Sequence, residues 1–412
     1  MFLFRCRGLA AALVLGLAAL GAHAAPGWTA AWAAAPQNFD ALPQLPGVPA
    51  APKWMVQGTV RQQLTVALDG KQVRVRFSNR FGQRPLRIAA ATVALGTGGG
   101  NLSPGTRQPL AIGGRAAFEV PAGQERWTDG ADLAVRAGQI LVVSFALAES
   151  VPATVVHRLP PDGAWLASGN QTDAAQLKDV QRKPWNLFVT GLDVKPPTPA
   201  NVLVAFGDSI TEGSGAESGA DAARYPQRLG VRLQGVAGHT PVAVINAGIG
   251  GNRLLADFTG PSGISRFDAD VLRQSGATHV LVLIGINDIG FGTFQGKLLP
   301  GFNPPTAQAL TDGLQQLVDR ARGRGLKVLL GTLLPFEGSG YWSEANEAKR
   351  EAVNRWIRGR QDVAVVDFDA ALRDPADGRR LAARYDSGDH LHPNAAGTAA
   401  MAQVADVPLL RE

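Results

Sequence analysis

The second half of the chain contains five short apolar runs that alternate with longer amphipathic stretches, and this alternation strongly constrains the fold. The runs are Asn201 to Phe206, Val242 to Asn246, His279 to Ile284, Lys327 to Leu333 and Val363 to Asp367. Short continuous apolar runs suit strands that are buried on both faces of a parallel sheet. Helices are predicted at Tyr225 to Gly235, Ile264 to Gln274, Thr306 to Arg324, Ser343 to Arg360 and Pro393 to Ala405. Residues 201–412 are therefore predicted to form a doubly wound, three-layer α/β/α domain of flavodoxin type.

Residues 25–195 follow a different rhythm, in which polar and apolar residues alternate as they do in half-buried strands. Such strands are predicted at Thr59 to Leu68, Val73 to Phe77, Arg87 to Leu95, Ile140 to Leu147 and Asn186 to Val194. Asp69-Gly70 is typical of a hairpin turn, and Gly96 to Gly100 predicts a flexible loop. We expect a β-sandwich of jelly-roll type, joined to the α/β domain by a stiff proline-rich linker at residues 196–200.

Six tryptophans lie in this strand-rich region: Trp28, Trp32, Trp54, Trp127, Trp165 and Trp185. Exposed tryptophans would suggest stacking on sugars. Because large aromatic side chains are usually mostly buried, we expect them to pack in the core or between the domains.

Residues 1–24 have the pattern of a secretory signal peptide. Arg5 and Arg7 precede an apolar run from Leu9 to Leu20, and Ala22-His23-Ala24 is a small-x-small cleavage site. Cys6 is the single cysteine, so the mature chain would contain no disulfide. The sequence predicts a secreted or periplasmic protein with no transmembrane segment in its mature chain.

Charge and motif spacing argue against several classes of partner. The net charge is +6, but no basic run is interleaved with aromatic residues, so nucleic-acid binding is not predicted. Gly248-Ile249-Gly250 follows a strand, yet Arg253 occupies the position of the third glycine of a dinucleotide loop. No Cys, His, Asp or Glu cluster has the spacing of a metal site, so neither a metal nor a cofactor is expected.

Four blocks of polar and glycine residues come after predicted strands. They are Gly207-Asp208-Ser209-Ile210-Thr211, Ala247 to Asn252, Gly285-Ile286-Asn287-Asp288, and Asp386 to Pro393. The first block alone is more typical of a helix N-cap than of a nucleophile, since Asp and Ser both cap well. Together, however, the blocks should meet at the carboxyl edge of the sheet, where open α/β folds carry their chemistry.

The four blocks, in this order, resemble the SGNH or GDSL-type hydrolases. The resemblance implies an acyl-enzyme mechanism in which Ser209 is the nucleophile, His392 the base and Asp389 the group that orients the base. It also implies an oxyanion hole formed by the backbone N–H groups of Ser209 and Gly251 and by the Asn287 side chain. Gly250 is an alternative to Gly251. A second alternative is that His390 acts as the base, with Asp386 as its partner.

The sequence thus predicts a secreted serine esterase that removes short acyl groups, most simply acetyl groups, from carbohydrate. A lipase, a lysophospholipase or an arylesterase of the same family is the alternative within the enzyme class. A non-catalytic carbohydrate-binding protein is the alternative outside it. The loop from Gly290 to Pro305, with Phe291, Phe294 and Phe302, is expected to border the substrate cleft. The oligomeric state is not predicted.

Overall fold

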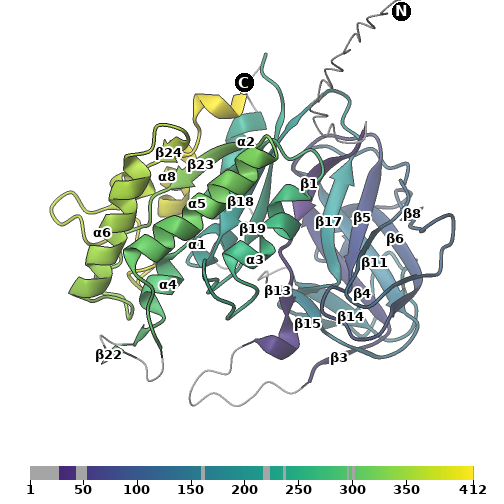
Figure 1. Cartoon of the computed structure of the whole chain (residues 1–412). Helices are drawn as coiled ribbons and strands as arrows, with labels where there is room; N and C mark the ends of the chain where they lie inside the picture. The colour runs from purple at the N-terminus through teal and green to yellow at the C-terminus, as the bar shows by residue number, and fades with distance from the viewer. Residues whose placement is uncertain are drawn as a thin grey trace, which may run out of the picture.

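The computed structural model describes residues 27–42, 53–158, 163–216, 223–234, 238–294, 297–298 and 302–411. The predicted signal peptide, its cleavage site and Cys6 lie outside these residues. A strand-rich region up to Val194, here called the β part, lies beside a region from Asn201 onward, here called the α/β part (Figure 1).

Two sheets face each other in the β part. The first has the order β1 (Thr29–Ala33), β17 (Val189–Val194), β5 (Val73–Ser78), β10 (Glu125–Trp127). The second has the order β15 (Gln181–Lys183), β14 (Ala164–Ala167), β4 (Thr59–Thr65), β11 (Ile140–Leu147), β6 (Leu86–Gly98), β7 (Asn101–Leu102), with β8 (Gln108–Pro109) and β9 (Phe118–Val120) also paired to β6. Phe77 of β5 meets Phe145 of β11 edge-on at 5.3 Å between ring centroids, and both rings are fully buried. The sheets therefore enclose one core, and the predicted β-sandwich is confirmed.

Two smaller sheets complete the β part. One pairs β12 (Val151–Pro152) with β3 (Met55–Val56). The other has the order β16 (Trp185–Leu187), β13 (Val155–Arg158), β2 (Gln37–Asn38), and β2 continues into the short 3-10 helix η1 (Phe39–Ala41).

Three local predictions for the β part were wrong. The Asp69-Gly70 turn does not close a hairpin, because β4 and β5 belong to opposite sheets. The strand β6 continues to Gly98 instead of ending before a loop at Gly96. The single strand predicted at Asn186 to Val194 is two strands, separated at Phe188, where φ is +59°.

The tryptophans follow the prediction in part. Trp32 and Trp165 are buried, with 8% and 5% of their surface exposed, and the other four are half-buried.

The α/β part is built on a parallel sheet with the order β19 (Val242–Gly248), β18 (Asn201–Gly207), β20 (His279–Leu283), β23 (Lys327–Gly331), β24 (Ala364–Val366). In chain order this is 2-1-3-4-5, the flavodoxin-type arrangement that the sequence predicts. Gly207 pairs with Gly248 on one side and with Leu283 on the other, so three strands end at one level. The segments that follow them are thereby brought together.

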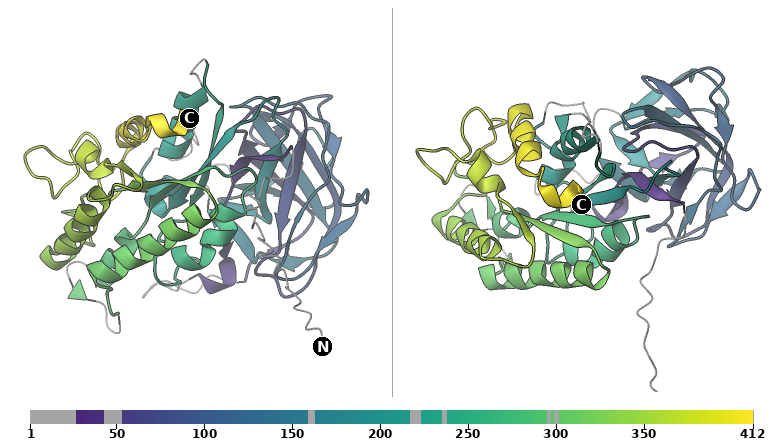
Figure 2. Two further views of the ribbon diagram at one scale, coloured as in Figure 1. Left: turned by 45° about the horizontal axis from the view of Figure 1, so that its top comes forward. Right: turned by 90° about the horizontal axis from the view of Figure 1, so that it is seen from above.

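Helices cover both faces of this sheet (Figure 2). They are α1 (Ser209–Glu212), α2 (Tyr225–Gln234), α3 (Gly263–Phe267), the π-helix η3 (Asp268–Leu272), α4 (Ile286–Gly290), α5 (Ala307–Gly323), α6 (Glu344–Arg358), α7 (Phe368–Leu372), α8 (Ala395–Val404) and the 3-10 helix η4 (Pro408–Arg411). The two-residue strands β21 (Thr293–Phe294) and β22 (Lys297–Leu298) pair antiparallel. On one face α2 packs against α8, and on the other α5 packs against α3 and α6.

Two helix predictions need correction. The helix predicted from Ile264 to Gln274 consists of α3 followed by a π-helical turn. The helix α8, predicted from Pro393, begins at Ala395, because the side chain of Asn394 accepts hydrogen bonds from the N–H groups of Ala396 and Gly397 as its N-cap.

Across the described ranges, no helix combines the length and apolar character needed to cross a bilayer.

The two parts share one hydrophobic core. The backbone N–H of Ala30 in β1 donates to the carbonyl of Ser275 at 2.9 Å, and Gln234 Nε2 of α2 donates to the carbonyl of Ala67 at 2.8 Å. Because these contacts fix the β part against the α/β part, residues from both can contribute to a single site.

Candidate active site

Ser209 lies just after the carboxyl end of strand β18, as the first residue of the one-turn helix α1. Asp208 is the N-cap, and its carboxylate accepts a hydrogen bond from the N–H of Ile210 at 3.0 Å. Asp208 therefore caps the helix, which leaves the side chain of the next residue, Ser209, free for chemistry. The Ser209 Oγ lies 2.8 Å from His392 Nε2, which is a distance suited to proton transfer.

His392 is held in position by Asp389. Its Nδ1 lies 2.5 Å from Asp389 Oδ2, while Asp389 Oδ1 accepts the backbone N–H groups of Leu391 and His392. Partial burial raises the pKa of Asp389, but the hydrogen bonds from the His392 side chain and backbone outweigh it and lower that pKa below its usual value. Asp389 is therefore ionised at neutral pH and can stabilise a positive charge on His392.

His390 and Asp386, the alternative pair of base and carboxylate, contact each other but lie apart from Ser209. His390 Nδ1 lies 2.5 Å from Asp386 Oδ2, and the His390 side chain is 52% exposed. His390 has a φ of +60° and does not line the cleft that contains Ser209. The geometry thus favours His392 over His390 as the partner of Ser209.

The glycine pair after β19 has two distinct roles. The backbone N–H of Gly250 donates to the Glu212 carboxyl group. Gly251 has a φ of +69°, and a Cβ there would lie 2.8 Å from Thr259 Cγ2, so only glycine fits without strain. Because the Gly250 N–H is directed at Glu212, Gly251 is the better candidate for an oxyanion donor.

Asn287 follows β20 and also lines the cleft. Its Nδ2 donates to the carbonyl of Asn252 at 3.0 Å, and its Oδ1 accepts the hydroxyl of Tyr341 at 3.0 Å. These two bonds fix which way the amide points. An amide nitrogen has two hydrogens, so one N–H remains for an oxyanion.

A buried arginine ties the strand ends together beneath the site. Arg266 donates to the carbonyls of Gly207 and Ala247 at 2.7 and 2.8 Å and to Asn252 Oδ1 at 2.9 Å. These bonds link the segments that carry Ser209 and Gly251. A fully buried cation needs such partners, and Asp270 supplies the opposite charge at 3.0 Å.

The cleft around Ser209 has a volume of about 320 Å³ and is lined by both parts of the chain. Its lining residues are Gln37, Leu42, Arg158, Trp185, Ser209, Glu212, Ser214, Gly250, Gly251, Thr259, Asn287, Tyr341, Leu391 and His392. The first four belong to the β part. Sequence reasoning missed these four because only the packing of the β part against the sheet edge brings them to Ser209. It also missed Glu212, which ends the helix that Ser209 begins, and Tyr341, which precedes α6 in the α/β part.

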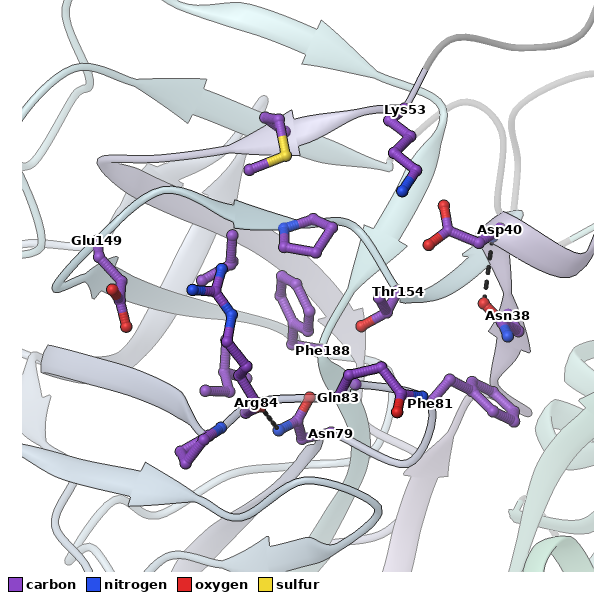
Figure 3. Close-up of a pocket in the computed structure, with 16 residues that line it drawn as sticks. Asn38, Asp40, Lys53, Asn79, Phe81, Gln83, Arg84, Glu149, Thr154 and Phe188 are labelled. Atoms are coloured by element: carbon purple, nitrogen blue, oxygen red, sulfur yellow. Dashed lines mark hydrogen bonds between the residues drawn. The ribbon is translucent and has the colours of Figure 1, made fainter.

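A second hollow, of about 420 Å³, lies in the β part (Figure 3). Lys53, Arg84 and Glu149 surround it, and Phe188 lies toward its floor. None of the predicted catalytic residues lines it. The chemistry therefore belongs to the smaller, interdomain cleft.

The loop from Gly290 to Pro305 lies differently from the prediction. Phe291 packs behind Tyr341 and against Phe258, at centroid distances of 5.6 and 4.7 Å. Phe302 lies against the guanidinium of Arg253. Neither ring lines the cleft, and the side chain of Phe294 lies outside the described residues. The described aromatic rings of this loop therefore support the cleft wall from behind.

Glu212 has an unusual protonation equilibrium. Burial raises the pKa of its carboxyl group from 4.5 to about 7, although the Gly250 N–H and the charges of Arg224 and Arg158 oppose the increase. The folded chain therefore keeps this proton over a pH range in which the unfolded chain has lost it. As the pH rises from about 4.5 to about 7, the free energy of unfolding should fall by about 3 kcal/mol on account of this group.

Glu212→Gln should remove this contribution to the pH dependence while keeping the shape of the side chain. We expect the variant to be at least as stable as the wild type at pH 8, and the stability difference between them to shrink toward pH 5. Denaturant unfolding at several pH values between 5 and 8 measures this. Parallel curves for the two proteins would contradict the assignment.

Ser209, His392 and Asp389 lie at the edge of a parallel sheet with the geometry of a serine hydrolase site. Residues 205–400 match the model of the GDSL-like lipase/acylhydrolase family, so this part of the chain is a domain of that family and the protein is an esterase. The resemblance to this family is thereby confirmed. No curated protein matches the chain.

Solved structures similar to this chain include three esterases or lipolytic proteins. A member of the lipolytic protein G-D-S-L family from Veillonella parvula is 17% identical, with a TM-score of 0.36, over 50% of this chain and 96% of that chain. A carbohydrate acetylesterase from Sinorhizobium meliloti is 17% identical and an aryl esterase from M. smegmatis is 19% identical. Both have a TM-score of 0.38 and cover 50% of this chain and 97% of the other.

Proposed function

We propose that the protein hydrolyses short-chain acyl esters, chiefly acetyl esters on carbohydrate, through an acyl-enzyme formed on Ser209. In this mechanism His392 removes the proton from Ser209 as the hydroxyl attacks the ester carbonyl. Asp389 stabilises the resulting imidazolium. The N–H groups of Ser209 and Gly251 and the Asn287 amide donate to the oxyanion. His392 then protonates the leaving alcohol. In the second half of the reaction a water molecule attacks the acyl-enzyme, His392 takes a proton from this water and returns it to Ser209 Oγ, and the acyl group leaves as a carboxylic acid.

The polar lining of the cleft is the observation that carries the preference for a short acyl group. Of its fourteen lining residues, only Leu42, Trp185 and Leu391 are large and apolar. A long acyl chain gains about 1 kcal/mol for each methylene that it buries against apolar surface, and this cleft offers little such surface. A hydroxyl-bearing alcohol, by contrast, suits a polar cleft.

A series of nitrophenyl esters from acetate to decanoate tests this preference. We expect kcat/KM to be highest for the two- to four-carbon acyl groups and to fall beyond them. Acetylated xylan should release acetate. A kcat/KM that climbs steadily to eight or ten carbons, with no acetate released from xylan, would replace this proposal with a lipase.

We also infer that the protein is exported from the cell, on the strength of the signal-peptide pattern in residues 1–24. Cleavage after Ala24 would give a mature chain that begins at Ala25. N-terminal sequencing of protein from the periplasm or culture medium should find Ala25 first. Recovery of the chain only inside the cytoplasm, with its N-terminus intact, would be inconsistent with export.

A further inference from the structure

The three-stranded sheet β16-β13-β2 forms the side of the cleft that the β part contributes. Arg158 pairs with Trp185 across β13 and β16, and Val156 pairs with Gln37 across β13 and β2. Gln37, Arg158 and Trp185 all line the cleft. The alcohol and acyl groups of a substrate at Ser209 therefore lie within a space that the β part helps to enclose.

Three residues that line this cleft each have a buried side-chain oxygen with no hydrogen-bond partner within the described residues. These oxygens are Gln37 Oε1, Thr259 Oγ1 and Glu212 Oε1. A buried polar atom without a partner costs about 1–3 kcal/mol, so such atoms are rare in folded proteins. Three of them in one cleft indicate a surface prepared for a polar ligand.

These atoms belong to one continuous wall. Gln37 Nε2 donates to the carbonyl of Thr259 at 2.6 Å, which joins β2 to the segment after Gly251. A Cβ placed on Gly251 would lie 3.3 Å from Thr259 Oγ1, and a Cβ placed on Gly250 would lie 2.7 Å from Glu212 Oε2. The three residues therefore flank the glycine pair, next to the position of the developing oxyanion.

The chemistry of the three atoms defines the ligand. A carboxamide oxygen only accepts hydrogen bonds, and a threonine hydroxyl both donates and accepts. The Glu212 carboxyl group, whose pKa burial raises to about 7, accepts when it is ionised and can also donate when it is protonated. Their natural partners are hydroxyl groups. An acetyl group has no hydrogen-bond donor, so the hydroxyls must belong to the alcohol portion of the ester.

We propose that Gln37, Thr259 and Glu212 bind free hydroxyl groups of the alcohol portion, so that the enzyme selects partly acylated polyols over simple alkyl or aryl esters. This inference rests on the proposed function and specifies it further. A sugar residue that carries one acetyl group keeps free hydroxyls beside the ester, whereas a phenyl or ethyl ester has none. The β part, through Gln37, thus takes part in substrate selection.

Thr259→Val tests the proposal with little disturbance. Valine has the shape of threonine without the hydroxyl, and the backbone carbonyl that accepts from Gln37 remains. We expect kcat/KM for a mono-O-acetyl methyl xyloside to fall about 10-fold, as for loss of one hydrogen bond in a buried site, and kcat/KM for phenyl acetate to change less than 2-fold. Thr259→Ser, which keeps the hydroxyl, should retain the preference for the xyloside.

Gln37→Met provides a second variant, since methionine is of similar length but lacks the amide. It too should lower kcat/KM for the xyloside more than for phenyl acetate. Equal losses on both substrates, or no loss on the xyloside, would overturn the proposed hydroxyl binding while leaving the esterase function intact. A wild-type enzyme that cleaves phenyl acetate but no acetylated xyloside would overturn both the carbohydrate function and this inference.

Discussion

Ser209→Ala should lower kcat for ester hydrolysis by roughly 10⁵- to 10⁶-fold, the loss expected when a serine nucleophile is removed from an intact triad. The side chain is small and 8% exposed, and its Oγ bonds to His392. Alanine fills the same space, so the variant should fold and unfold as the wild type does. The residual rate should come from the oxyanion donors and from binding alone.

Ser214→Ala is the matched control for this substitution. Ser214 lines the same cleft and follows α1 by two residues, but the hydrogen bond to His392 Nε2 comes from Ser209. The control should keep activity within a few-fold of the wild type. Wild-type activity in Ser209→Ala, or a comparable loss in Ser214→Ala, would remove Ser209 from its proposed role.

Asn287→Ala is expected to have the next largest effect, a loss of about 10²- to 10³-fold in kcat, as for removal of one oxyanion donor. KM should change little, because the bond to the oxygen tightens mainly in the transition state. Steady-state kinetics with nitrophenyl acetate measures both constants. An unchanged kcat would show that the Asn287 amide does not stabilise the oxyanion.

Tyr341→Phe tests how much the orientation of the Asn287 amide contributes to catalysis, apart from the presence of the amide itself. The variant keeps Asn287 but loses the 3.0 Å hydrogen bond from the tyrosine hydroxyl to Asn287 Oδ1. A less firmly oriented amide should lower kcat by about 10-fold, far less than loss of the amide itself. If Tyr341→Phe matched Asn287→Ala, the tyrosine hydroxyl would have to act directly on the substrate.

The α/β part could be predicted closely because its signals are local. The five strands of the parallel sheet, β18, β19, β20, β23 and β24, are short apolar runs next to glycine or polar residues, a pattern typical of strands that are buried on both faces. The β part was harder. Asp69-Gly70 is typical of a hairpin turn whether the next strand pairs with the previous one or crosses to the opposite sheet, as β5 does here. That choice depends on contacts far apart in the sequence.

The site residues also divide into those with a local sequence signal and those that only long-range contacts bring together. Ser209, Asn287 and His392 follow strand ends or a glycine-rich turn, and their types and order point to acyl transfer. Gln37, Arg158 and Trp185 carry no such signal. Gln37 lies in a two-residue strand, and it reaches the cleft because β2 pairs with β13 and because its amide bonds to Thr259, 222 positions away. Such long-range contacts follow from the packing of two folded parts and not from any local pattern.

Covalent labelling with a fluorophosphonate tests the central claim, that Ser209 is the nucleophile of an esterase, most directly. The native protein should take up one phosphonyl group, and mass spectrometry of its peptides should locate that group on Ser209. Labelling should be lost in Ser209→Ala and retained in Ser214→Ala. A label on another serine, or no label on a protein that still hydrolyses esters, would contradict the account.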